Sequence, residues 1–242
     1  MTEHPRIVPG DPASGLLLIA DHLSDHVPAD IDLGIDPALL EKHIAVDIGI
    51  AALAEELRAR LDCPAVHAGV SRLVVDLHRE RANPKAIPVL TDGHAIPGNA
   101  LLDEAGREAR LERFWDPYHR AIEAEIDRYR PRMLFTPHSF TPKLETDPGP
   151  PRVWQVGILY NRDERAPRIA IPLLEARGLS VGDNEPYSGR ELNATMNLHA
   201  ERRGLPYLAI EIRNDLIGSR EGARQWADIV APVIAATRDA LE

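Results

Sequence analysis

The sequence predicts an α/β fold of three layers, in which helices cover both faces of a mixed, mostly parallel central sheet. Short apolar segments, typical of buried strands, alternate along the chain with longer segments of helical periodicity. Polar clusters directly follow several of these strands, which is where open α/β sheets bind ligands. The chain of 242 residues contains no internal repeat and no low-complexity linker. One domain over residues 1–242 is therefore the simplest organisation.

The first third of the chain is expected to contain one buried strand, one long helix and a pair of strands. Residues 15–20 (GLLLIA) form a short apolar run that ends in polar residues and predict a buried strand. Residues 37–62 place apolar side chains near helical spacing and predict one amphipathic helix. Residues 64–80 predict a strand, a turn and a second strand, because their segment LVVDL is apolar and β-branched.

The rest of the chain is expected to begin with a loop, after which predicted helices and strands alternate. Residues 82–99 contain three prolines and two glycines and predict a long loop, which is uncommon unless it is functional. Residues 101–130 are expected to be mostly helical, with an interruption at Pro117. Further strands are expected over residues 131–140, 153–160, 179–189 and 206–216, and further helices over residues 168–178 and 220–242.

Composition limits the classes of partner and compartment. The net charge of −10 argues against a general binder of nucleic acid or anionic membranes, since neutralising phosphates needs a positive surface. The single cysteine, Cys63, excludes an intramolecular disulfide and favours a reducing compartment. No signal-peptide core or membrane-length apolar run is found. We therefore expect a cytoplasmic protein without nucleic-acid or membrane partners. The sequence predicts no oligomeric state.

His22 and Asp25 form an H-x-x-D pair directly after the strand predicted at residues 15–20. Side chains three residues apart in a loop or a first helical turn can lie on one side and bind one cation. His138, in TPHSF, follows another predicted strand and is the best candidate for a third ligand. Two histidines and a carboxylate are typical of a catalytic zinc site. The alternative is that His22 is a loop histidine that binds the backbone.

Glu211 stands among apolar residues in LAIEIRNDL, on a strand that is expected to be central. A buried carboxylate is costly without a partner or a task, and burial raises the pKa of a general base toward neutrality. The alternative is a buried ion pair with Arg213, because residues two apart lie on the same face of a strand.

Arg72 and Arg79 flank the segment LVVDL and suggest an anionic substrate, since guanidinium groups recognise carboxylates with two hydrogen bonds. For either arginine the alternative is a salt bridge, for instance with Asp76 or Glu80. Competing signatures are missing from the sequence: there is no phosphate-binding G-x-x-x-x-G-K-[ST] loop, no G-x-G-x-x-G and no G-x-S-x-G nucleophile turn.

The polar clusters fall in five segments: ADHLSDHVP, VSRLVVDLHRE, TPHSFTP, DNEPYSG and LAIEIRNDLI. In this order they resemble the signature segments of the N-formylglutamate amidohydrolase family, over nearly the whole chain. That family is similar in fold to zinc carboxypeptidases and aspartoacylase-like deacylases. The resemblance thus implies an α/β/α sandwich of the zinc-exopeptidase and phosphorylase/hydrolase-like kind, with zinc (Zn²⁺) at the strand ends.

The resemblance also implies roles for single residues. His22 and His138 match the histidines that bind the zinc ion, and Glu211 matches the general base. Asp25 falls where the exopeptidases keep a glutamate ligand. Arg79, with His78 before it, matches the element that holds the carboxylate of the substrate.

The activity implied by the resemblance is hydrolysis of N-formyl-L-glutamate, a small anionic N-acyl amino acid, to formate and glutamate, a step of histidine degradation. Arg72 or Arg213 would stabilise the developing oxyanion, and Tyr187 of DNEPYSG would contact the substrate. The family usually has DLNR where this chain has DLHR, so His78 replaces an amide. Two alternatives therefore stay open: a hydrolase for a different N-acyl or C-terminal amino acid, and a non-catalytic binder of an anionic amino-acid-like ligand.

Overall fold

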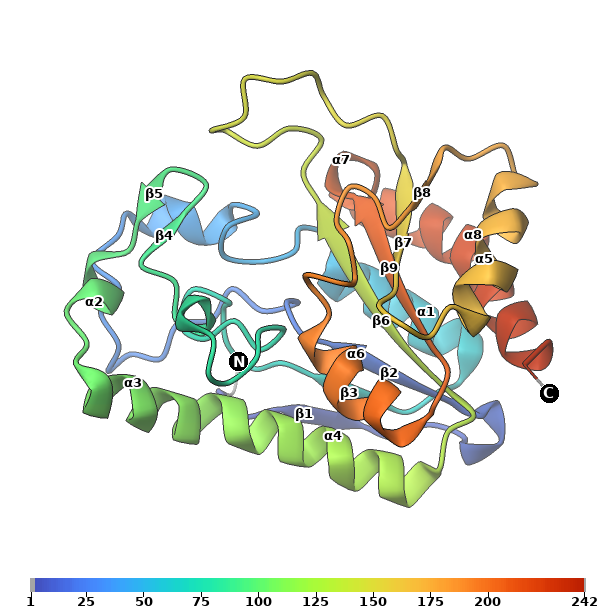
Figure 1. Cartoon of the computed structure of the whole chain (residues 1–242), viewed down its shortest axis with the longest axis horizontal. Coiled ribbons are helices and arrows are strands. Elements are labelled where there is room, and N and C mark those ends of the chain that lie inside the picture. The colour runs from blue at the N-terminus through green and yellow to red at the C-terminus, as the bar shows by residue number, and fades with distance from the viewer. Residues whose placement is uncertain (1–2, 242) are drawn as a thin grey trace.

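The computed structural model describes residues 3–241, and its centre is a sheet of seven strands (Figure 1). The strand order is β1-β3-β2-β6-β9-β7-β8. Strands β3, β2, β6 and β9 run parallel, whereas β1 and β7 are antiparallel to their neighbours β3 and β9. The predicted mixed, mostly parallel sheet is thus confirmed. The bounds are β1 (Arg6–Val8), β2 (Leu16–Ala20), β3 (Ala65–His67), β6 (Met133–Phe140), β7 (Val156–Leu159), β8 (Val181–Asp183) and β9 (Tyr207–Arg213).

Helices cover both faces of the sheet, which confirms the three layers (Figure 1). Helices α1 (Ile50–Leu61), α5 (Arg165–Glu175) and α8 (Arg220–Asp239) pack on one face. Helices α4 (Asp116–Tyr129) and α6 (Ala194–His199) pack on the other. Every side chain of β2 is buried, because alternate residues of this central strand contribute to the cores on opposite faces. In the described part of the chain, no helix combines the length and the apolar character needed to cross a membrane.

The single helix predicted over residues 37–62 is wrong. A 3-10 helix, η2 (Pro37–Glu41), is followed by an irregular stretch, and α1 begins only at Ile50. The break falls at Gly49, whose φ of +87° lies in the left-handed region that favours glycine. A Cβ atom here would lie 2.2 Å from the carbonyl oxygen of Ile217. The irregular stretch places Asp47 beside the segment that follows β2, because the N–H of Asp47 donates to the carbonyl oxygen of His22 (2.9 Å).

The second strand predicted within residues 64–80 is also wrong. After β3 the chain forms a series of turns, although Val74, Val75 and Leu77 are fully buried. Its backbone groups bond to other loops: the Asp76 N–H donates to the carbonyl oxygen of Ala86 (2.7 Å). The apolar, β-branched composition therefore reflects burial of a loop rather than an extended ladder.

Residues 82–99 contain more secondary structure than the predicted loop, whereas residues 101–130 are mostly helical as predicted. The expected long loop holds the 3-10 helix η3 (Pro84–Ala86), the hairpin of β4 (Leu90–Thr91) and β5 (His94–Ala95), and α2 (Pro97–Ala100). The helix that follows is interrupted as predicted, because a π-helical turn separates α3 from α4 just before Pro117. The bounds of the remaining elements are η1 (Pro12–Ser14), α3 (Glu104–Arg110), η4 (Leu111–Trp115), η5 (Glu201–Arg203) and α7 (Asn214–Ile217).

Candidate metal centre

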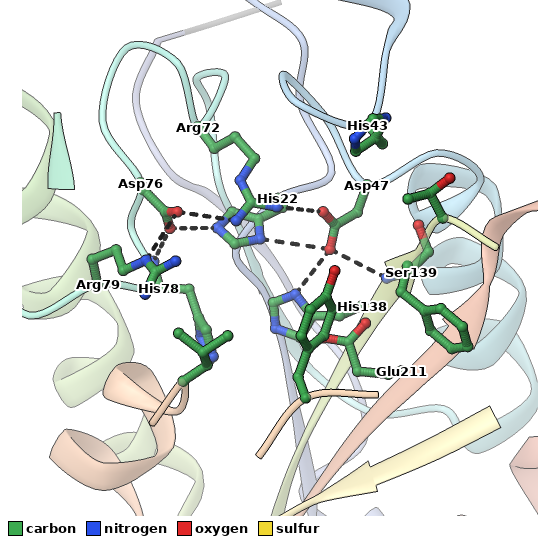
Figure 2. A pocket seen from close by; sticks show the side chains of 14 residues that line it. His22, His43, Asp47, Arg72, Asp76, His78, Arg79, His138, Ser139 and Glu211 are labelled. Carbon is green, nitrogen blue, oxygen red and sulfur yellow. Dashed lines mark hydrogen bonds and ion pairs between the residues drawn. The ribbon is translucent and has the colours of Figure 1, made fainter. Parts of the chain in front are cut away.

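The carboxyl ends of three parallel strands meet at one cavity of about 140 Å³. His22 follows β2, and His138 lies in β6 opposite Glu211 of β9 in the parallel register. All three side chains are buried and line the cavity (Figure 2). The sheet topology therefore brings together three residues that are widely separated in the sequence.

Asp47 supplies the carboxylate that lies beside both histidines. Its Oδ2 atom is 3.0 Å from Nδ1 of His138 and 3.5 Å from Nδ1 of His22. Ligand atoms about 2.1 Å from a tetrahedral zinc ion lie about 3.4 Å from one another. The two distances from Asp47 are close to this edge length, and the three ligand atoms all lie within 4.8 Å of one another. The N–H of Ser139 donates to the same carboxylate oxygen (3.2 Å) and holds it in place.

Each histidine of this cluster has a carboxylate on its other ring nitrogen. Nε2 of His22 donates to Oδ1 of Asp76 at 2.7 Å, and Nε2 of His138 lies 3.4 Å from Oδ2 of Asp21. Such outer carboxylates fix the tautomer and the orientation of metal-binding histidines and make them stronger ligands. Both imidazoles therefore point their Nδ1 atoms at Asp47.

The electrostatics of the cluster favour a cation. Nδ1 of His22 is buried without a hydrogen-bond partner in the described part of the chain, so its lone pair is free for a ligand. Burial lowers the pKa of His138, but the hydrogen bonds to Asp21 and Asp47 outweigh this effect and raise the pKa to about 10. A protonated His138 therefore supplies the positive charge that the carboxylates favour. A bound divalent ion would replace this proton and supply the charge itself. The residues present fit such an ion.

A second cluster shares His138 but is less suited to a metal ion. Oδ2 of Asp21 lies 2.9 Å from Nδ1 of His78 and 3.4 Å from Nε2 of His138. The other oxygen of Asp21 already accepts hydrogen bonds from Tyr118 (2.9 Å) and Thr195 (3.1 Å). Asp21 does not line the cavity, whereas Asp47 does. Asp21 therefore serves as a buried acceptor that orients the histidines around it.

Glu211 lies in the cavity and has no ion-pair partner among residues 3–241. It is 8% exposed, and its Oε2 atom makes no hydrogen bond in the described structure. Burial raises the pKa of Glu211 to about 7, and the nearby His138 opposes this rise. The alternative pairing with Arg213 is not formed, because the Arg213 guanidinium binds Asp215 (2.8 Å) and does not line the cavity. A buried carboxylate with this pKa can accept a proton near neutral pH.

The two arginines of the buried loop after β3 have different environments. Arg72 donates to Oδ1 of Asp47 and to Oδ2 of Asp76, at 3.0 Å each, and so ties the two carboxylates together. The guanidinium of Arg79 pairs with Asp76, with Nε 3.5 Å from Oδ2. Arg79 lines the cavity, and its side chain has no other ion-pair partner in the described chain. Because Arg79 makes one longer ion pair and Arg72 makes two at 3.0 Å, Arg79 is the less constrained guanidinium of the cavity.

His78 and Tyr187 complete the wall of the cavity. Nδ1 of His78 is held by Asp21 (2.9 Å), and burial lowers the pKa of His78. The hydroxyl of Tyr187 accepts a hydrogen bond from Arg152 (3.0 Å), whose guanidinium lies 4.8 Å from the Tyr187 ring centroid. Both side chains therefore have fixed positions beside the metal-binding cluster.

The structure does not bring Asp25 into the cluster. Asp25 is half buried, does not line the cavity and belongs to neither group of potential ligands. Sequence reasoning missed Asp47 and Asp21, and it named Asp76 only as a salt-bridge partner of the arginines, a pairing that the structure confirms for Arg72 and Arg79. One signal for Asp47 was present: the glycine two residues later lies inside the predicted helix and marks a break there.

Fold and site together define an α/β protein with a candidate histidine and aspartate metal centre at the carboxyl ends of its strands. The model of the family N-formylglutamate amidohydrolase matches residues 14–218. The chain therefore belongs to the N-formylglutamate amidohydrolase family, a family of hydrolases, as the resemblance of its five segments predicts.

Two solved structures are similar over almost the entire chain. The product of gene Atu2144 from Agrobacterium tumefaciens is 30% identical with a TM-score of 0.90, over 99% of this chain and 96% of that one. The N-formylglutamate amidohydrolase from Ralstonia eutropha JMP134 is 18% identical with a TM-score of 0.69, over 99% and 98% of the two chains. The second likeness concerns the fold alone. No curated protein sequence matches this one.

Proposed function

We propose that this protein is a zinc-dependent hydrolase that cleaves the amide bond of a small N-acyl amino acid. One observation carries the proposal: three potential ligand atoms, on His22, Asp47 and His138, converge beside the unpaired carboxylate of Glu211. Two imidazole nitrogens and one carboxylate oxygen are a common ligand set of catalytic zinc. Family membership supports the reaction class.

A zinc ion in this cluster would polarise the acyl carbonyl group and acidify a water molecule. Glu211 takes the proton of the attacking water, because a buried carboxylate with a pKa near 7 is partly ionised at neutral pH. The water oxygen bonds to the acyl carbon, the C–N bond breaks, and Glu211 delivers the proton to the leaving amine. Asp76 and Asp21 hold the two imidazoles in the required tautomers throughout.

The substrate that we propose first is N-formyl-L-glutamate, which is hydrolysed to formate and glutamate. Arg79 lines the cavity, has only one long ion pair, and would bind the carboxylate of the amino acid. Arg72 would face the developing oxyanion, since it lies in the cavity wall and carries a half-buried positive charge. Tyr187 and His78 would flank the acyl amino acid. We place the reaction in the cytoplasm.

A second candidate keeps the chemistry and changes the substrate. His78 stands at the position where the DLNR segment of the family has an amide, and it lines the same cavity as Arg79. A ring at this position changes both the shape and the hydrogen bonds offered to the amino acid. A different N-acyl amino acid is therefore the alternative substrate.

Metal analysis and one conservative variant test the proposal. The purified protein should contain about one zinc ion per chain. Glu211→Gln should keep this ion and lower kcat by about two to four orders of magnitude. Glu123→Gln, at an exposed position of α4, is the matched control and should keep full activity. An active Glu211→Gln enzyme would refute the role of Glu211. A panel of formyl, acetyl and succinyl amino acids separates the two candidate substrates.

A further inference from the structure

Three further hollows lie next to the cavity at the candidate metal centre, because neighbouring hollows share lining residues. His78, Arg79 and Leu192 line this cavity and also line a second hollow of about 130 Å³. Ala194 and Asn197 are shared between that hollow and a third of about 290 Å³. Asn197 and Arg202 are shared between the third and a fourth of about 420 Å³. We call these three outer hollows, which follow α6 and η5, the α6 groove.

Asn197 lines all three hollows of the α6 groove and presents hydrogen-bond donors to them. Its Oδ1 atom accepts from Nδ2 of Asn161 (3.2 Å) and from Nδ2 of Asn193 (3.3 Å). These two bonds fix the amide orientation. Nδ2 of Asn197 has no acceptor in the part of the chain described by the structure. The groove thus contains an oriented donor that only a ligand or water can satisfy.

The end of the α6 groove farthest from the metal centre is cationic. Arg162 and Arg202 line it, and neither guanidinium has an ion-pair partner among residues 3–241. The carboxylate of Asp163 pairs with Arg165 (2.6 Å). The carboxylate of Glu201 accepts from the N–H of Arg162 (2.8 Å) and from the Tyr207 hydroxyl (2.9 Å), two neutral donors that leave its negative charge in place. Two unpaired arginines and one unpaired carboxylate give this hollow a net positive charge.

The hollow nearest the metal centre is balanced in charge. Arg79 and Arg190 face Glu80 and Glu191 there. Between the two ends, Trp115 and Leu198 add apolar surface. A ligand that fits this series of hollows has an amide at the metal centre, a polar backbone along the α6 groove and negative charge at its distal end.

We propose that the α6 groove binds the distal part of an N-acylated acidic peptide, so that the substrate extends beyond one amino acid. This inference rests on the proposed amide hydrolysis and names its substrate class. The acyl amide lies at Glu211, the chain passes Leu192 and Arg79, and distal carboxylates reach Arg162 and Arg202. The reaction is the same as for a single N-acyl amino acid. Water adds its OH to the acyl carbon and a proton to the nitrogen, and the peptide leaves as a free amine.

The experiment compares N-formyl-triglutamate with N-formylglutamate in the zinc-loaded enzyme. In the double variant Arg162→Ala/Arg202→Ala, KM for the tripeptide should rise about fivefold or more, because two exposed ion pairs are lost. KM for N-formylglutamate should stay within about twofold of the unmodified enzyme. Arg220→Ala, at the exposed start of α8 on the other face of the sheet, is the matched control and should change neither value.

Direct binding separates this inference from the proposed chemistry. Fluorescein-labelled triglutamate is titrated with the unmodified protein and with the double variant, and fluorescence anisotropy is measured. Weaker binding to the double variant supports the groove even if neither formyl compound is hydrolysed, in which case the proposed function fails alone. Unchanged binding and unchanged KM overturn the groove. Turnover of N-formylglutamate with none of the tripeptide overturns it as well.

Discussion

Nε2 of His22 lies 2.7 Å from Oδ1 of Asp76, and both side chains are buried. This bond leaves Nδ1 of His22 as the free ligand atom. Asp76→Asn keeps the size of the side chain and removes its charge, so the imidazole becomes a weaker ligand. Zinc affinity should fall about tenfold to a hundredfold, measured by competition with a chromogenic chelator. Asp103→Asn, at the exposed start of α3, is the control. Equal affinity of Asp76→Asn and the unmodified protein would contradict the role of Asp76.

We expect opposite effects on zinc binding from replacing Asp47 and from replacing Asp25. Asp47 lies against both histidines, whereas Asp25 lies outside the cavity. Asp47→Ala should purify with less than a tenth of the zinc of the unmodified protein, and Asp25→Ala should keep about one ion per chain. Metal content by mass spectrometry decides between them. Loss of zinc from Asp25→Ala alone would restore the ligand set expected from the sequence.

Arg79 and Arg213 differ in their freedom to bind a substrate carboxylate. Arg79→Met should raise KM for N-formylglutamate about tenfold to a hundredfold, because a charge-assisted hydrogen bond is lost. Arg213 is bound to Asp215 outside the cavity, so Arg213→Met should leave KM within about twofold. Steady-state kinetics at saturating zinc measure both. The assignment fails if the two variants exchange these results.

Acid should destabilise the protein through the buried pair His119 and His199. Their rings stack, and Nδ1 of His119 lies 2.7 Å from Nε2 of His199. Burial lowers the pKa of His119 to about 4 and that of His199 to about 3, so folding favours the neutral rings. The stability is complete above the unfolded pKa near 6.5 and is lost as pH falls through the folded values of about 4 for His119 and about 3 for His199.

This loss has a measurable slope. Each such histidine contributes up to about 1.4 kcal/mol per pH unit to the decline in unfolding free energy between these limits. Urea unfolding at a series of pH values measures the slope. His119→Gln should flatten it, because one buried titrating ring is removed. A slope that is identical in the variant would show that the acid sensitivity arises elsewhere.

Leu53 anchors α1 to the sheet. Its side chain is fully buried in the core under α1 and α8. Leu53→Ala should lower the free energy of unfolding by about 2–5 kcal/mol, as cavity-forming substitutions do. Leu101→Ala is the matched control, since Leu101 is 86% exposed and should change the stability by less than about 0.5 kcal/mol. Comparable losses in the two variants would refute this assignment of the core.

The strands that carry the site were predictable because their apolar runs are short and continuous. GLLLIA and MLFT read as buried strands, and the polar residues after them lie at one sheet edge in the structure. His22, His138 and Glu211 are brought together for this reason. A short apolar run followed by polar residues is a local signal for residues of this kind.

Asp47 was not predictable in the same way. It stands in a segment whose spacing is helical, and only the contact of Gly49 with the carbonyl oxygen of Ile217 shows why the helix cannot extend there. The segment LVVDL led to the wrong prediction of a second strand within residues 64–80, since β-branched residues are equally suited to a buried loop. Both errors depend on contacts between residues far apart in the sequence, which local patterns do not contain.

Gly49 also sets a limit for anyone who wishes to engineer a more robust version of this protein. Replacing a helix-adjacent glycine by alanine is a standard way to stabilise a fold, since it restricts the unfolded chain. Here the alanine methyl group would collide with the Ile217 carbonyl, and a longer α1 would draw Asp47 away from His22 and His138. Thermostability screens on this chain should therefore leave the Asp-Ile-Gly segment untouched and seek improvement on the solvent-facing side of α8.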